Sequence, residues 1–176
     1  MIKANIYYSA SFASSLVSGL TGPIYVVFLL FSRISPIQIS LILVSSRVAT
    51  ALFEFPTGIF ADLYGRRISV LISYASAVFI SLGYFSGNTF WHFLILSILS
   101  GIFFTFQSGA KEALMIDDLS IARGDQIRNR VFVKLSSWSN TGFILGGILA
   151  TIISPHSLRL IWIAASLVNT AIFFLY

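Results

Sequence analysis

The sequence predicts an all-α membrane protein with six transmembrane helices, on two observations: its composition and the spacing of its apolar stretches. Of the 176 residues, 57% are hydrophobic and only 10% are charged. A soluble domain carries roughly 25% charged residues because its surface faces water. Too few polar side chains remain here to cover a water-soluble globule, so lipid is the expected solvent for most of the surface.

Six apolar stretches are long enough, or nearly so, to cross the hydrocarbon core, which takes about 20 residues of helix. Lipid offers the backbone no hydrogen-bonding partner, so each stretch is expected to be a helix. Together they form a single transmembrane domain over residues 1–176. The expected spans are residues 6–31, 37–61, 68–87, 91–115, 135–153 and 159–176.

Four of the five connections are short and carry turn residues, whereas residues 116–134 are expected to form a long polar loop. One side of the expected topology holds only Arg33 and Arg159. Basic residues favour the cytoplasmic side, so the amino terminus and the loop 116–134 are expected in the cytoplasm, with the spans in a bacterial inner membrane. The basic residues of that side are Lys3, Arg66, Arg67, Arg123, Arg128, Arg130 and Lys134.

Composition excludes several other classes of protein. The net charge of +5 does not indicate nucleic-acid binding, because the charges lie between apolar stretches and form no basic stripe interleaved with aromatics. The absence of cysteine excludes disulfides, thiolate metal sites and thiol nucleophiles. The stretch 6–31 is longer than the core of a cleavable signal and is expected to be the first permanent span.

The most specific pattern lies between the second and third spans, where residues 58–67 read Gly-Ile-Phe-Ala-Asp-Leu-Tyr-Gly-Arg-Arg. This segment resembles the G-x-x-x-D-x-x-G-R-R signature of the major facilitator superfamily at all five fixed positions. The preceding residues 54–57, Glu-Phe-Pro-Thr, are similar to the E-x-P-T-G lead-in of its bacterial drug-exporter-like members. The resemblance implies the amino-terminal six-helix half of such a bundle, for which two three-helix inverted repeats are one arrangement.

The residue types of this segment, proposed as a gating motif, have physical reasons. Gly58 is expected to let a neighbouring helix approach closely, and Gly65 to adopt a left-handed conformation in a tight turn. Asp62 ends one helix and Arg66 and Arg67 open the next, so each charge opposes the local helix dipole and indicates a distant partner. By resemblance, Asp62 is a latch on the cytoplasmic gate; the alternative for the two arginines is that they only fix topology.

Two ionisable residues, Arg47 and Glu54, interrupt the second span. Each costs about 2.5–3.5 kcal/mol near a helix centre on insertion scales, so their face must meet protein or water. We expect both to line a polar cavity, with Glu54 as the proton carrier; the alternative is a structural bond to a neighbouring helix. No cofactor is expected, and a proton gradient is the expected energy source. Thr105 occupies the position where many proton-coupled members carry an arginine, so Arg47 substitutes for it or coupling differs.

The fourth span ends in residues 108–117, which resemble the S-G-A-x-E-A-L-x-x-D segment of a subset of these transporters. Its charged residues are expected to form a cytoplasmic network with Arg66, Arg67 or the basic loop, or else to be solvated ends. The members of this network are Lys111, Glu112, Asp117 and Asp118.

Glycines in two further spans indicate close packing or bending. Gly142, Gly146 and Gly147 partly resemble the glycine-rich motif of drug exporters, without its proline. They form a face of small residues on the helix, which suits close packing against another helix. In the first span, Gly19, Gly22 and Pro23 would permit a kink or an exposed stretch of backbone.

The resemblance implies transport of a small solute by alternating access, with proton-coupled, multidrug-like efflux favoured. Alternatives are an uptake permease of the same family, or a non-transporting half-unit that dimerises or acts as a scaffold. An intramembrane serine protease is disfavoured, because His92 and His156 fall in connections and cannot serve Ser108 as a base; no enzyme is expected. The expected partners are a small-molecule substrate, the bilayer, and a carboxyl-terminal six-helix half or a second copy, since the chain stops at Tyr176 without a basic flank.

Overall fold

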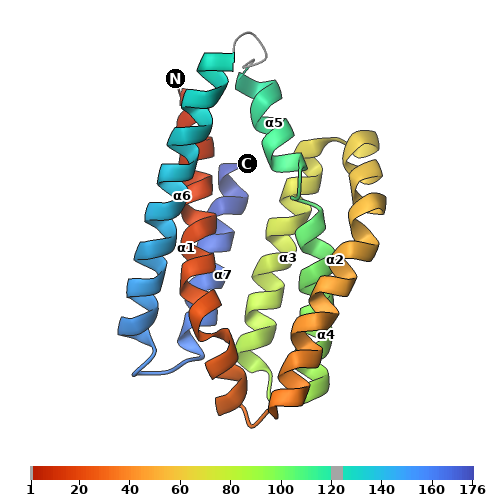
Figure 1. Ribbon diagram of the computed structural model, residues 1–176, viewed down its shortest axis with the longest axis vertical. Coiled ribbons are helices and arrows are strands. Elements are labelled where there is room, and N and C mark those ends of the chain that lie inside the picture. The colour runs from red at the N-terminus through yellow and green to blue at the C-terminus, as the bar shows by residue number, and fades with distance from the viewer. Residues whose placement is uncertain (1, 120–124) are drawn as a thin grey trace.

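The computed structural model describes residues 2–119 and 125–176. This part of the chain is helical and contains no strand, which confirms the predicted fold class. The two halves of the fourth span are separate helices, so the six spans comprise seven helices (Figure 1). The helices are α1 (Ile2–Phe31), α2 (Pro36–Tyr64), α3 (Arg66–Ser86), α4 (Phe90–Thr105), α5 (Ala110–Leu119), α6 (Asp125–Ile153) and α7 (Leu160–Leu175).

Within the described residues, four segments are long and apolar enough to cross a membrane: Asn5–Phe31, Pro36–Tyr64, Arg66–Ser86 and Phe90–Asp118. The apolar helix α7 is shorter, at 16 residues. The 29-residue α6 is long enough but has polar and charged residues in its first half. The helices run roughly parallel to one long axis, as expected for helices that cross one lipid bilayer (Figure 1).

The ends of α2 show how local sequence sets the helix boundaries. Ser35 caps its start: the Ser35 Oγ accepts from the Gln38 backbone N–H at 3.4 Å, and the Gln38 Oε1 accepts from the Ser35 backbone N–H at 3.0 Å. Pro36 follows in the first turn, where its missing N–H is not needed. Gly65 ends α2 with a φ of +99°, a conformation that L side chains rarely adopt, and α3 begins at the next residue.

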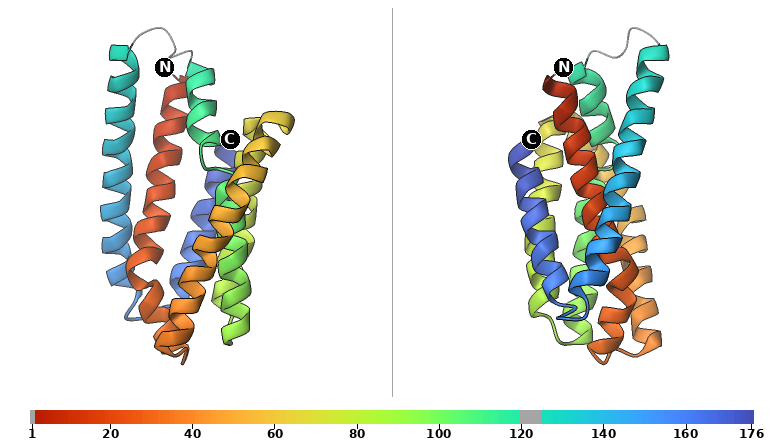
Figure 2. Two further views of the ribbon diagram at one scale, coloured as in Figure 1. Left: turned by 45° about the vertical axis from the view of Figure 1, so that its right-hand side comes forward. Right: turned by 90° about the vertical axis from the view of Figure 1, so that its left-hand side faces the viewer.

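The helices pack in three main pairs: α1 with α6, α2 with α4, and α3 with α7. Figure 2 shows α6 lying alongside α1, and α2 crossing α4. Exchanging spans one, two and three with spans four, five and six turns the α1–α6 pair into the α4–α2 pair. The α3–α7 pair is exchanged with itself, so the same three pairs result. This exchange is what an inverted repeat of two three-helix units requires.

Glycines bring the paired helices into backbone contact. A Cβ atom on Gly142 or Gly146 of α6 would lie 2.2 Å from a carbonyl oxygen of α1, a distance that real Cβ atoms essentially never show. Gly101 of α4 meets the Ser46 carbonyl oxygen of α2 in the same way, at 2.3 Å. Gly147, grouped with the other α6 glycines in the sequence, leaves open space around its own Cβ position.

The expected loop 116–134 is largely helical in the structure. α5 continues to Leu119 and α6 begins at Asp125, while residues 120–124 lie outside the described part of the chain. Charged residues were interpreted as a sign of a loop, but on helix ends that extend beyond the apolar layer they are solvated without breaking the helix.

Candidate functional site

A cavity of about 720 Å³ lies among α1, α2, α3, α4, α5 and α7. Both three-helix units contribute to its wall, and most of the lining side chains are hydroxyl, amide or charged groups. Polar groups in the middle of apolar helices are expensive unless they face protein or water, so this gathering marks the cavity as the candidate site. The lining hydroxyl residues include Ser14, Ser15, Ser18, Thr21, Ser46, Thr50, Ser73, Ser81, Ser97 and Ser100.

Arg47 lines the cavity from α2, and its side chain is exposed. The adjacent Ser46 packs against Gly101 of α4, which places Arg47 near the crossing of these helices. Glu54, seven residues further along α2, is exposed and lies outside the lining. The Ser108 Oγ, which does line the cavity, donates to the Glu54 Oε1 at 3.4 Å. The two charges of α2 therefore occupy different environments.

The fourth span is broken beside the cavity, whereas its sequence favours one continuous helix. α4 ends at Thr105, and α5 begins at Ala110 after Gly109 turns the chain with a φ of +72°. The Phe106 carbonyl, freed by the break, accepts a hydrogen bond from the Ser69 Oγ of α3 at 2.7 Å. The break directs the first residues of α5 into the cavity wall, and discontinuous helices of this kind often form solute sites in transporters.

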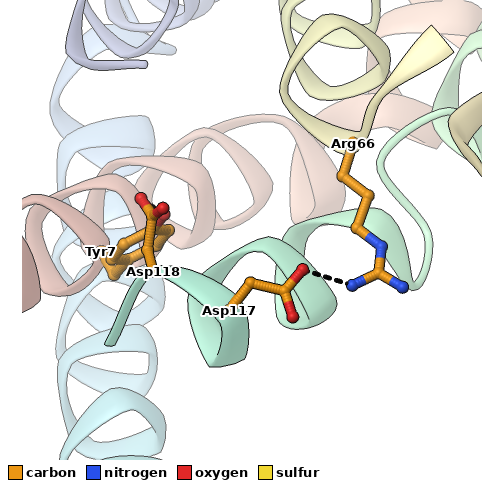
Figure 3. A network of polar contacts seen from close by, with 4 residues as sticks. All are labelled: Tyr7, Arg66, Asp117 and Asp118. Carbon is orange, nitrogen blue, oxygen red and sulfur yellow. Dashed lines mark hydrogen bonds and ion pairs between the residues drawn. The ribbon is translucent and has the colours of Figure 1, made fainter. Parts of the chain in front are cut away.

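The start and the end of α5 hold different charged groups. Lys111 and Glu112 line the cavity at its start. At its end, Asp117 and Asp118 contact the two flanking helices (Figure 3).

These end contacts connect α5 to α3 and α1. The Arg66 Nη1 lies 2.5 Å from the Asp117 Oδ2, and the Tyr7 hydroxyl donates to the Asp118 Oδ2 at 2.6 Å (Figure 3). Arg66 thus has an acidic partner of the kind expected, whereas Asp118 binds a tyrosine that the sequence analysis had not singled out. The ion pair is partly exposed, so it stabilises the fold by only about 0–1 kcal/mol.

The remaining charges of the gating motif differ in their contacts. The Arg67 Nε donates to the Tyr176 carbonyl oxygen at 2.7 Å. Asp62 is exposed and has no hydrogen bond or ion pair with the side chains that the structure describes. The side chains of Lys3, Arg123 and Arg128 lie outside the described part.

No helix in the described part of this chain approaches Gly58 closely, so the neighbour expected there is not found within it. A Cβ atom added to Gly58 would meet nothing within 4 Å, because this side of α2 is uncovered. Gly65 was expected in a left-handed conformation: its φ of +99° is positive, as that requires, while its ψ of 138° lies outside the left-handed helical region.

An aromatic layer forms the end of the cavity near the α1–α2 and α3–α4 turns. The Tyr25 and Tyr84 hydroxyls lie 2.8 Å apart, and the Tyr84 ring stacks on Trp162 with ring centroids 4.3 Å apart. Phe28 and Phe93 are buried beneath these rings. At this end the Arg159 guanidinium also donates to the Phe85 carbonyl oxygen at 3.1 Å, fixing α7 against the end of α3.

Apolar spans packed around a cavity lined by many polar residues define a membrane-embedded helical bundle. The chain belongs to the major facilitator superfamily, whose family model matches residues 7–176. This confirms the suspected family.

A similar protein is an uncharacterized MFS-type transporter of Bacillus subtilis (strain 168), YxaM. The two are 36% identical over 70 residues, which cover 40% of this chain and 18% of that protein. The matched segment therefore spans less than a fifth of this relative's length.

Proposed function

We propose that this chain forms the amino-terminal half of a transporter that moves a small solute across the cell membrane by alternating access. The cavity carries the proposal: both three-helix units line it, and its polar wall lies within apolar helices. In this arrangement the cavity is one half of a solute pathway, and a second six-helix bundle, either a carboxyl-terminal half or a second copy, supplies the other. The amino terminus and the α2–α3 turn face the cytoplasm.

The uncovered outer side of α2 is an argument for a second bundle. Large apolar side chains are exposed along it, and the acids Glu54 and Asp62 are exposed on the same helix. Lipid could cover the apolar groups but would leave the acids unpaired at high cost. The exposed apolar residues of α2 include Val44, Val48, Leu52, Phe53, Phe55, Ile59 and Leu63.

Within the gating motif, Asp62 is the residue that we propose engages the second bundle. Arg66 and Arg67 already bind groups of this chain, whereas Asp62 binds none that the structure describes. Gly58, one turn before Asp62 on the uncovered α2, leaves room for the backbone of a partner helix. The motif then divides into two arginines that hold this half together and an acid that grips and releases the other half.

We further propose that Glu54 carries the coupling proton and that the solute leaves the cell. Glu54 bonds Ser108 at the break in the fourth span, so a change in its charge acts on the segment that positions α5. The direction rests on the resemblance of residues 54–58 and 108–117 to drug exporters. Multidrug-like efflux is the form that this resemblance favours, and the hydroxyl and charged groups among the lining residues leave hydrophilic solutes as a second class.

The full-length gene that encodes this chain, expressed in a strain that lacks its main exporters, tests this function. Energised cells should accumulate less of at least one solute from a panel of radiolabelled hydrophilic and lipophilic compounds, and an uncoupler should abolish the difference. Higher accumulation that depends on energy would indicate uptake and overturn the proposed direction. An unchanged content of every compound would count against transport and favour the scaffold alternative.

A further inference from the structure

The charged groups that line the cavity are not balanced. Arg47 from α2 and Lys111 from α5 are cationic, and Glu112 is the single acid among the lining residues of the described chain. The cavity therefore presents a net positive wall although it lies among apolar helices.

Lys111 is held without a carboxylate partner among the described side chains. Its Nζ donates to the Ser14 Oγ at 3.3 Å. That hydroxyl in turn donates to the Ala10 carbonyl oxygen at 2.7 Å and lies 2.7 Å from the Tyr74 hydroxyl. Neutral hydroxyl groups compensate a largely buried ammonium group only in part, because they carry no opposite charge.

Many of the wall hydroxyls have already used their hydrogen atoms. Thr21 Oγ1 donates to the Val17 carbonyl oxygen at 2.9 Å, and Ser81 Oγ donates to the Ala77 carbonyl oxygen at 2.7 Å. Ser18 and Thr50 donate to carbonyl groups of their own helices in the same way. A hydroxyl that donates to its own helix can only accept from a ligand, so the wall suits a molecule with hydroxyl or amino hydrogens.

Two other features of the cavity are compatible with such a ligand. The first turn of α5 faces the wall and adds the positive end of a helix dipole to the charge of Lys111. The volume of about 720 Å³ lies within the range of small-molecule sites, roughly 300–1,000 Å³. A lipophilic cation would instead meet two like charges in this cavity.

We propose that the cavity binds a small hydrophilic organic anion that carries hydroxyl or amino groups, and that Arg47 and Lys111 neutralise its acidic group. The inference rests on the proposed function, because it names the substrate class of the same cavity. It departs from the multidrug expectation, in which bulky apolar compounds occupy the site.

The sequence contains no cysteine, so a single Ser100→Cys substitution places the sole thiol of this chain in the wall. Ser100 adjoins Gly101, which packs against the neighbour of Arg47. In full-length protein stripped of native cysteines elsewhere, two thiol reagents of similar size probe the site: anionic sulfonatoethyl and cationic trimethylammonioethyl methanethiosulfonate. Relative to a free reference thiol, the ratio of anionic to cationic reaction rates at the introduced thiol should rise about tenfold.

The variants Arg47→Gln and Lys111→Gln should each lower this ratio, and the double variant should abolish the preference. Arg47→Lys and Lys111→Arg keep the charge and should keep the preference, which separates charge from misfolding. Arg33→Gln is the matched control, because Arg33 is exposed in the α1–α2 turn and outside the cavity lining. A preference that survives both charge removals would overturn the inference.

Protection of the introduced thiol then tests the ligand itself. Gluconate, glutamate and glucose 6-phosphate are the anionic probes, and glucose and choline are their neutral and cationic counterparts. At least one anion should slow the labelling, and the double variant should remove this protection. Protection by choline or glucose alone, or by no probe, would overturn the anionic class while leaving transport standing. A thiol in this position that reacts with neither reagent would instead contradict the aqueous cavity and thus the proposed function.

Discussion

The Ser108 Oγ lies 3.4 Å from the Glu54 Oε1, so the acid of α2 meets the break in the fourth span rather than the interior of the cavity. This contact connects a candidate proton carrier to the short segment, residues 106–109, that sets the position of α5. A change in the charge at Glu54 can therefore reach Lys111 and the cavity wall through three residues of backbone.

Glu54→Gln should abolish the pH dependence of transport, because the amide cannot exchange a proton. The measurement is solute flux in inside-out vesicles under an imposed pH gradient. Ser108→Ala removes the partner but not the titrating group, so it should shift the pH dependence without abolishing it. Flux in Glu54→Gln that follows the gradient as in the unmodified protein would rule out the proton role.

Asp62→Asn should reduce transport while leaving the thermal stability of this six-span unit unchanged, since Asp62 has no partner among the described side chains. Arg66→Gln is the comparison: it loses the pair with Asp117 and should lower the unfolding free energy by about 0–1 kcal/mol. Transport and thermal unfolding in detergent measure the two effects. Full transport by Asp62→Asn would exclude the latch.

Gly58→Ala should be tolerated by this chain alone but should impair transport by the full-length protein. The added methyl group meets nothing within 4 Å here, whereas a second bundle packed on α2 would clash with it. Gly65→Ala instead places a side chain at a φ of +99° and should destabilise the chain itself by about 1–2 kcal/mol. If Gly58→Ala transports normally, no helix approaches closely at that position.

Gly146→Ala should destabilise the bundle by about 1–3 kcal/mol, because the new Cβ would lie 2.2 Å from the Leu16 carbonyl oxygen and force α1 and α6 apart. Gly147→Ala is a matched control one residue away, with open space around its Cβ. Thermal unfolding of the two variants in the same detergent gives the difference. Equal stability would mean that α1 and α6 do not pack as closely as described.

The sequence was informative where residue type alone decides structure. Gly65 was expected to have a positive φ because it joins two helices directly, and Gly142 and Gly146 were expected in close packing because both are spaced for one helix face. Arg47 was expected at a cavity because an intramembrane guanidinium cannot face lipid. Each inference needed only local spacing and the cost of a buried charge.

What could not be read from the sequence depends on the relative placement of distant helices. The break at residues 106–109 is short, and apolar residues on both sides of it favour one continuous span. The available signal was Gly109 next to two polar residues, Gln107 and Ser108. The hydrogen bond between Tyr7 and Asp118 joins residues 111 positions apart, so it depends on where α5 lies relative to α1. Glu54 shares a helix face with Arg47, but the two lie about 10 Å apart along the helix axis, and only Arg47 lines the cavity.

Alternating access is the central claim, and two-sided labelling of the Ser100→Cys variant tests it most directly. A membrane-impermeant maleimide, applied separately to intact cells and to inside-out vesicles, should label the introduced thiol from both sides, while Phe79→Cys, exposed on α3 but outside the cavity lining, stays unlabelled. A saturating solute or a pH gradient should raise labelling from one side and lower it from the other. Labelling from one side only, unchanged by any solute or gradient, would contradict the account.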